Sequence, residues 1–179
     1  MIIEKIDYSD KYNLIILTID GEDLSLSYDF YNNLNLSVKD EVDFDTYKEI
    51  LKENQYNMAK IFALAKISYS QKTSFEIIKL LKENDFDNNA IDRTIEFLDS
   101  YNLIDDVSYV KSFVHDKSSI SRWSKNKIHY ALRSKKIDDE IIEDCMSEIT
   151  DEEEYEKAYD FAIKKYHGKT DQNTKQKVY

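Results

Sequence analysis

Hydrophobic positions near the amino terminus follow a different period from those in the rest of the chain. Apolar residues cluster at 2–8, 12–19 and 24–28, and the alternation in the last stretch is the period of a half-buried strand. Asp20-Gly21 lies between the second and third stretches. This pair favours a type I′ hairpin, because both central positions of that turn need positive φ. We predict a three-stranded antiparallel β-meander that packs on the helices or on a partner, since three short strands are marginal alone.

Beyond the meander, apolar residues recur every three or four positions, which is typical of amphipathic helices. A long helix is expected over 47–67. The next helix should begin at Thr73, because its hydroxyl and the carboxylate of Glu76 can form a reciprocal capping box. A third helix is expected to begin at Asp87.

The helical pattern then repeats with an offset of 51 residues, which sets Phe86 against Ile137 and the helix start Thr73 against Ser124. A period of about 50 residues is too long for a two-helix solenoid and predicts three helices per unit. Further positions share this offset: Ile77 and Ile128, Leu81 and Leu132, Asp87 and Asp138, Ile91 and Ile142, Ile95 and Met146, Leu98 and Ile149.

A third copy is expected to start at Thr150, which can form a capping box with Glu153. Its second helix would begin at Thr174, so we expect this sequence to lack a carboxy-terminal helix pair. The predicted fold is mostly α, with tandem three-helix repeats in an elongated arc behind a small antiparallel β-meander. The expected domains are the β-meander extension at 1–44, repeat one at 45–104, repeat two at 105–149 and an incomplete third repeat at 150–179.

Composition supports a folded helical protein. A hydrophobic fraction of 41% with 13% aromatic residues is too rich for a disordered chain, despite 34% charged residues. The absence of Pro, with only Gly21 and Gly168, argues against all-β folds and Gly-rich nucleotide-binding loops. The single cysteine, Cys145, excludes an intramolecular disulfide and a thiolate zinc cluster. With no signal-peptide pattern and no run of 18 apolar residues, these features predict a soluble, cytoplasmic protein without a membrane partner.

The segment LIDDVSYVKSFV, residues 103–114, links the first two helical units. Tandem three-helix units with this segment resemble the RecX family of recombination regulators. The resemblance covers residues 58–166 clearly, and the strand-rich head resembles the amino-terminal extension of members from low-GC Gram-positive bacteria. The matching positions are Leu103-Ile104-Asp105-Asp106, Tyr109 and Phe113-Val114.

Three helix ends depart from the family pattern, since Asp85, Asn102 and Lys136 stand where members usually carry Gly. These residues are expected to adopt the left-handed conformation, which Asn tolerates well, Asp moderately and Lys poorly. Each replacement costs about 1 kcal/mol or less relative to Gly. Members also often have Gly-Pro at Ser124-Lys125, where Ser124 is an alternative N-cap.

The resemblance implies a regulatory protein that binds RecA recombinase filaments on single-stranded DNA and modulates, most often inhibits, their ATPase and strand exchange. It implies a binding protein rather than an enzyme, without catalytic residues, a metal or another cofactor. The expected partners are the RecA filament and single-stranded DNA, and we expect a monomer.

Charge is segregated around the second repeat, although the net charge is −11. Residues 117–137 contain seven Lys and Arg and no acid, whereas residues 138–156 contain eleven acids and no Lys or Arg. A local basic face with an aromatic side chain suits a phosphate backbone with stacked bases. The DNA- or RecA-binding candidates are therefore Arg122, Trp123, Lys125, Lys127, Arg133, Lys135 and Lys136.

The same features have alternative interpretations. The two charge blocks could be solvated helix faces that attract each other across a turn, with exposed pairs worth about 0.2–1 kcal/mol each. Trp123 could pack on Ile128 as a hydrophobic staple. Asp105-Asp106 is interpreted as a helix cap rather than a catalytic pair. The acidic block could instead mimic a phosphate backbone and occupy a DNA-binding groove.

Other chemistry has little support in the sequence. His115, His129 and His167 are separated by 14 and 38 residues, which does not fit a helical metal pair. No nucleophile elbow, Gly-rich phosphate loop or Walker lysine occurs. Two other classes of function are compatible with the pattern: a helical nucleic-acid-binding module that acts without a recombinase through a helix at 122–136, and a protein-only scaffold.

Overall fold

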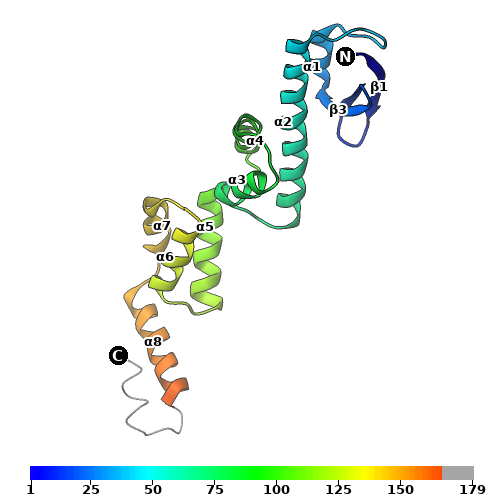
Figure 1. The fold of residues 1–179 in the computed structure, drawn as a ribbon. Helices are drawn as coiled ribbons and strands as arrows, with labels where there is room; N and C mark the ends of the chain where they lie inside the picture. Colours follow the sequence, from blue (N-terminus) through cyan, green and yellow to red (C-terminus); the bar gives the residue numbers. More distant parts are fainter. Residues whose placement is uncertain (167–179) are drawn as a thin grey trace. The chain divides into compact units, whose positions relative to one another are not determined.

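The computed structural model describes residues 1–166, which are mostly helical with one small sheet (Figure 1). The chain divides into two compact units, Met1–Asp105 and Asp106–Tyr179. Thr174, where a helix was expected to start, and His167 lie outside the described residues. The first unit contains β1 (Ile3–Ser9), β2 (Leu14–Ile19), β3 (Glu22–Ser27), α1 (Tyr28–Leu34), α2 (Phe44–Tyr69), α3 (Ser74–Glu83) and α4 (Asn88–Ser100). The second contains α5 (Asp106–His115), the π-helical turn η1 (Asp116–Ile120), α6 (Lys125–Ser134), α7 (Asp139–Met146) and α8 (Asp151–Tyr166).

The amino-terminal strands form the predicted antiparallel meander, in the order β1-β2-β3. Asp20 and Gly21 form the turn between β2 and β3 with φ angles of 47° and 83°, as a type I′ turn requires. Tyr28 was expected in the third strand but begins α1. The reason is local, because the Ser27 side chain accepts a hydrogen bond from the amide of Phe30 and caps the helix.

The long helix α2 covers the outer strand of the sheet. The side chain of Asn54 accepts a hydrogen bond from the Ser25 amide at 2.8 Å, and the side chain of Asn57 donates to the Ser25 carbonyl at 3.0 Å. An outer strand otherwise leaves such backbone groups without a strand partner. Ile50 of α2 is fully buried in the same apolar cluster as the sheet. The meander therefore gains the support from helices that its small size requires.

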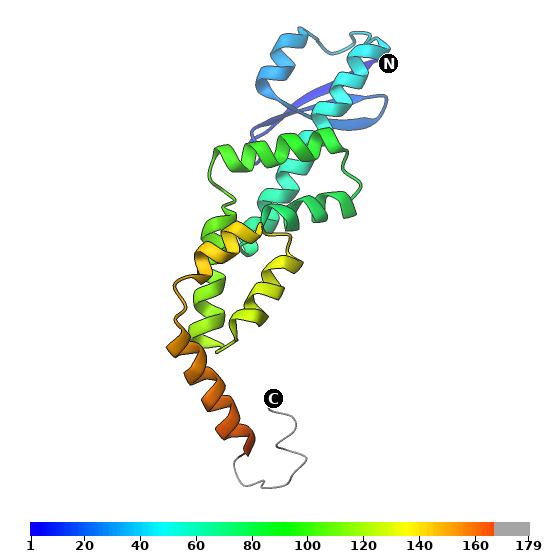
Figure 2. The ribbon, with the colours of Figure 1, turned by 90° about the vertical axis from the view of Figure 1, so that its left-hand side faces the viewer.

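Helices α2, α3 and α4 form the first three-helix module, with α4 crossing α2 (Figure 2). The Thr73 hydroxyl accepts from the Glu76 amide at 3.2 Å, and the Glu76 carboxylate accepts from the Thr73 amide at 3.1 Å, which confirms the capping box. Asp87 caps α4 by accepting from the Ala90 amide at 2.8 Å. The buried core of this module is Ala59, Ala63, Ile77, Leu81, Ala90, Ile91, Leu98 and Ile104.

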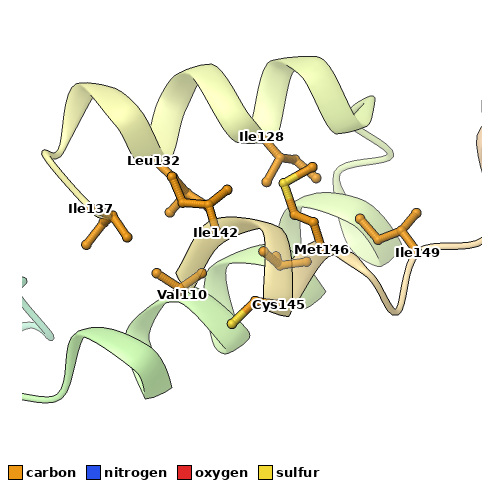
Figure 3. Close-up of a cluster of buried hydrophobic side chains, with 9 residues drawn as sticks. Val110, Ile128, Leu132, Ile137, Ile142, Cys145, Met146 and Ile149 are labelled. Carbon is orange, nitrogen blue, oxygen red and sulfur yellow. The ribbon is translucent and has the colours of Figure 1, made fainter. Parts of the chain in front are cut away.

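Helices α5, α6 and α7 form a second module of the same kind, whose apolar side chains converge between the three helices (Figure 3). The rings of Tyr109 and Phe113 pack against this core with centroids 6.0 Å apart. Asp138 caps α7, in the position that Asp87 has in the first module. The buried core is Val110, Val114, Ile128, Leu132, Ile137, Ile142, Cys145, Met146 and Ile149.

The three helix ends that lack the family's glycine adopt the predicted left-handed conformation. The φ angles are 59° at Asp85, 51° at Asn102 and 57° at Lys136. At each of these positions a helix ends, and only a residue with positive φ allows the closing hydrogen bonds of the turn that follows it. The backbone geometry is therefore maintained without Gly.

The last described helix, α8, differs from the others in its burial. It begins with the predicted capping box, in which Thr150 and Glu153 exchange two hydrogen bonds of 3.2 Å. Along its described length, however, α8 has no buried residue. The side chains of Tyr155 and Phe161 are 71% and 61% exposed. Contacts of α8 with the rest of its unit are therefore mainly polar.

Candidate functional site

Helix α6 is the centre of the predicted basic face, but it is shorter than the helix expected at 122–136. It spans Lys125–Ser134, and the Ser124 hydroxyl accepts from the Lys127 amide at 3.4 Å. Ile128 and Leu132 are fully buried, one turn apart on the face that packs into the module. This packing leaves the basic side chains of α6 on or near the surface.

The structure divides the seven candidate residues between the two ends of α6. Because α6 has ten residues and a helix rises 1.5 Å per residue, these ends are about 15 Å apart. We call Arg122, Trp123, Lys125 and Lys127 the amino-end group. We call Arg133, Lys135 and Lys136 the carboxyl-end group.

Trp123 belongs partly to the core of its module. Its ring packs edge-on against Phe113, with centroids 6.3 Å apart, and contacts the buried cluster that contains Ile128. The ammonium of Lys127 lies 4.0 Å from the Trp123 centroid, and that of Lys117 lies 5.1 Å from it. These are cation–π distances. Trp123 is therefore both a packing residue and the aromatic surface beside which two cations gather.

Three carboxylates of α8 contact the amino-end group. Arg122 Nη2 lies 2.7 Å from Asp160 Oδ2, and Lys125 Nζ lies 3.6 Å from Asp151 Oδ1. The backbone amide of Lys125 donates to Glu154 Oε2 at 3.1 Å. This amide belongs to the first turn of α6, where the helix dipole favours a negative group. The acids of α8 thus contact one backbone amide and two cationic side chains at the start of α6.

A groove of about 490 Å³ lies between the start of α6 and α8. Trp123 and Phe161 contribute aromatic surface, and Arg122, Lys127 and Lys157 contribute positive charge. The Lys157 ammonium donates to Ser118 Oγ at 2.6 Å and to Glu154 Oε1 at 3.1 Å. Aromatic rings beside cations can bind a base and its phosphate.

Arg133 of the carboxyl-end group and His129 of α6 lie beside acids of α7. Arg133 Nε lies 3.2 Å from Asp139 Oδ1, and His129 Nε2 lies 3.2 Å from Glu143 Oε1. Lys135 Nζ lies 5.4 Å from the Tyr109 ring centroid. Attraction between the basic and acidic blocks, which the sequence offered as an alternative interpretation, is therefore present. The exposed Arg133–Asp139 pair is worth about 0.2–1 kcal/mol, which leaves the guanidinium accessible to a stronger anion.

Other candidate chemistry finds no support in residues 1–166. Within that range, no group of three or more His, Cys, Asp or Glu side chains is placed to hold a metal ion. No helix among the same residues combines the length and apolar character needed to cross a membrane. Burial raises the pKa of the Cys145 thiol, so the thiol stays protonated and weakly nucleophilic.

A buried polar network in the first unit was not predicted from the sequence. Glu53 is only 4% exposed, and its carboxylate accepts from Arg93 Nη2 and from Ser27 Oγ, both at 2.8 Å. Burial raises the pKa of Glu53, but hydrogen bonds from Arg93, Ser27 and Asn57 outweigh it and leave the pKa below its ordinary value. The available signal was the spacing of Glu53 and Asn57 from Ile50, by three and seven residues, because those positions share one helix face.

The fold defines a class of protein: mostly helical, with a small β-sheet followed along the chain by three-helix modules, the second of which carries basic side chains at its surface. A model of the RecX second three-helix domain matches residues 105–146. The regulatory protein RecX of Finegoldia magna is 33% identical over 150 residues, which cover 83% of this chain and 73% of the relative. RecX of Clostridium perfringens strain 13 is 36% identical over 125 residues, 70% of this chain but only 58% of the relative.

Solved structures agree with these relatives. A crystal structure of regulatory protein RecX matches with a TM-score of 0.79 at 25% identity, over 99% of this chain and 89% of that one. The crystal structure of RecX from Lactobacillus salivarius matches with a TM-score of 0.62 at 27% identity, over 70% of this chain and 83% of that one. The chain belongs to the RecX family of regulatory proteins, which confirms the resemblance drawn from the sequence.

Proposed function

We propose that this protein binds RecA recombinase filaments on single-stranded DNA and restrains their ATP hydrolysis and strand exchange. Membership of the RecX family is the observation that carries the proposal, because the relatives are named regulatory proteins. The protein acts by binding, as a monomer in the cytoplasm, and catalyses no reaction itself.

The proposed contact surface is the pair of cationic groups at the two ends of α6. Their separation of about 15 Å lets one helix contact several phosphates or neighbouring filament subunits, so that weak contacts act together. Each neutralised phosphate of a single strand adds about −0.7 to the slope of log affinity against log salt concentration. Binding through this surface is therefore expected to weaken steeply as salt is raised.

The test is RecA ATPase activity on single-stranded DNA, measured with wild-type protein and two charge-reversed variants. Arg122→Glu/Lys127→Glu reverses the amino-end group, and Arg133→Glu/Lys136→Glu reverses the carboxyl-end group. Each variant is expected to need at least about tenfold more protein for half-inhibition, as expected for the loss of about two phosphate contacts.

The matched control is Lys48→Glu/Lys52→Glu, which makes the same change in charge on exposed positions of α2. It is expected to inhibit like the wild type. Equal inhibition by all four proteins would refute the assigned surface. Tight binding to naked single-stranded DNA with no effect on RecA would favour the nucleic-acid-binding module. Absence of DNA and RecA binding at any salt concentration would favour the protein-only scaffold.

A further inference from the structure

Helix α8 is attached to its unit mainly by electrostatic contacts. No residue of its described length, Asp151–Tyr166, is buried. The attachment instead involves the ion pair of Arg122 with Asp160, the Lys125 amide bound to Glu154, and the Lys157 ammonium bound to Ser118. A helix held in this way can separate from its neighbours without exposing a hydrophobic core.

The α8 carboxylates occupy positions that suit phosphate oxygens. Glu154 accepts from an amide in the first turn of α6 and from the Lys157 ammonium, and Asp160 binds the Arg122 guanidinium. Helix amino termini, lysine and arginine are the groups that bind phosphate in proteins. A donor that is bound to a carboxylate of α8 is not available to an incoming phosphate in the same geometry.

We infer that α8 is an intramolecular competitor of single-stranded DNA for the amino-end group of α6. In the closed state, Glu154 and Asp160 neutralise the start of α6. In the open state, DNA phosphates replace these carboxylates, and a base can stack on the ring of Trp123, on the α6 side of the groove. The inference rests on the proposed function, because it assumes that the amino-end group contacts DNA.

We call the contacts of Glu154 and Asp160 with the amino-end group the latch. These contacts are weak enough to form and break reversibly. The side chains of Arg122 and Asp160 are 45% and 50% exposed, and an exposed ion pair shifts an equilibrium by about fivefold at most. Several phosphates acting together can therefore displace α8. Rising salt weakens the latch and DNA binding alike, so mutation of the carboxylates separates the two effects better than salt does.

The test compares two variants with equal charge changes. Glu154→Gln/Asp160→Asn weakens the latch, whereas Glu152→Gln/Glu156→Gln neutralises two exposed acids of the same helix. Binding of a fluorescein-labelled oligothymidylate is followed by anisotropy at constant salt. Relative to the control, the latch variant is expected to bind about threefold to tenfold more tightly, because it weakens one exposed ion pair and one partly buried hydrogen bond. Equal affinities of the two variants would overturn the competition.

Trp123 provides an independent measurement, because it is the single tryptophan of the chain and lines the groove beside α8. Acrylamide is expected to quench its fluorescence more strongly in the DNA-free latch variant than in the wild type or the control. Equal quenching in all three would show that these carboxylates do not hold α8 closed, and would also overturn the inference. Circular dichroism of each variant checks that the helices are retained.

The failures of the two proposals can be told apart. If the wild type inhibits the RecA ATPase but the two variants bind DNA equally, the inference is wrong and the proposed function stands. If no protein inhibits the ATPase but the difference in DNA affinity remains, the proposed function is wrong and the latch stands.

Discussion

Phe86 and Ile137, 51 positions apart, make the same backbone contact in their two modules. The amide of Phe86 donates to the Leu81 carbonyl at 3.2 Å, and the amide of Ile137 donates to the Leu132 carbonyl at 3.4 Å. Each follows a residue with a left-handed backbone, which is the arrangement of a Schellman motif. Both side chains pack against the core of their own module. The two modules therefore share the geometry of one helix–turn–helix unit.

Replacing Lys136 by Gly is expected to stabilise the second unit. Lys136 has a φ of 57°, which a residue with a Cβ adopts at a cost and Gly adopts freely, so the gain is about 0.5–1 kcal/mol. Urea unfolding followed by Trp123 fluorescence measures it, because the only tryptophan lies in this unit. The control, Ser134→Gly, places Gly at the last residue of α6, where φ is helical, and should lower stability. A destabilising effect of Lys136→Gly would contradict a left-handed backbone conformation at Lys136.

The caps of α3 and α6 are expected to differ in strength. Thr73 is buried and forms a reciprocal box with Glu76, whereas Ser124 makes one hydrogen bond of 3.4 Å. Thr73→Ala should cost about 1–2 kcal/mol and Ser124→Ala about 0.5 kcal/mol. Urea denaturation followed by circular dichroism at 222 nm, a wavelength that reports helix loss, gives both values. Equal costs would show that the box adds nothing to the cap.

Removing the Arg93 side chain is expected to destabilise the first unit. Glu53 is buried and would lose its cationic partner, and a hydrogen bond to a charged group is worth about 1.5–3 kcal/mol. Arg93→Ala should lower the free energy of unfolding by about that amount. Asp92→Ala, at an exposed neighbouring position, is the control. Chemical denaturation of both variants is the measurement, and equal stabilities would exclude a role for the buried ion pair.

Stability should decline in acid partly because of Glu53. The pKa of Glu53 is below its ordinary value of 4.5, so the unfolded state binds a proton more readily than the folded state. Its contribution is present above about pH 4.5 and is lost as pH falls through the lower, folded-state pKa. Thermal unfolding across this range should show a shallower decline for Glu53→Gln than for the wild type. If the unfolding temperatures of the two proteins fell in parallel with pH, the loss of stability in acid would be due to other carboxylates.

Much of the fold could be predicted because its signals are local. The Asp20-Gly21 turn, the Thr73 capping box and the left-handed Lys136 each depend on residues within about five positions. The repeat was visible because the same local signals recur at one spacing. The turn η1 had no comparable signal, because π-helical turns are rare and no short-range sequence pattern marks this one.

The candidate site was predicted less completely. The sequence identified the basic residues around α6, and it offered both a binding surface and mutual attraction of the charge blocks. It did not indicate that Arg122 and Trp123 lie before the first residue of α6, because sequence reasoning places helix boundaries poorly. It also left open which acids face which cations.

The sequence by itself determined most of the elements, their caps, the modular repeat and the RecX family, because short-range backbone chemistry and hydrophobic period specify them. Tertiary structure alone decided that Glu53 meets Arg93 across 40 residues and that Arg122 meets Asp160 across 38. The physical reason is that polar pairs between distant segments contribute little to choosing the fold. They form where the packing of apolar faces has already brought their helices together.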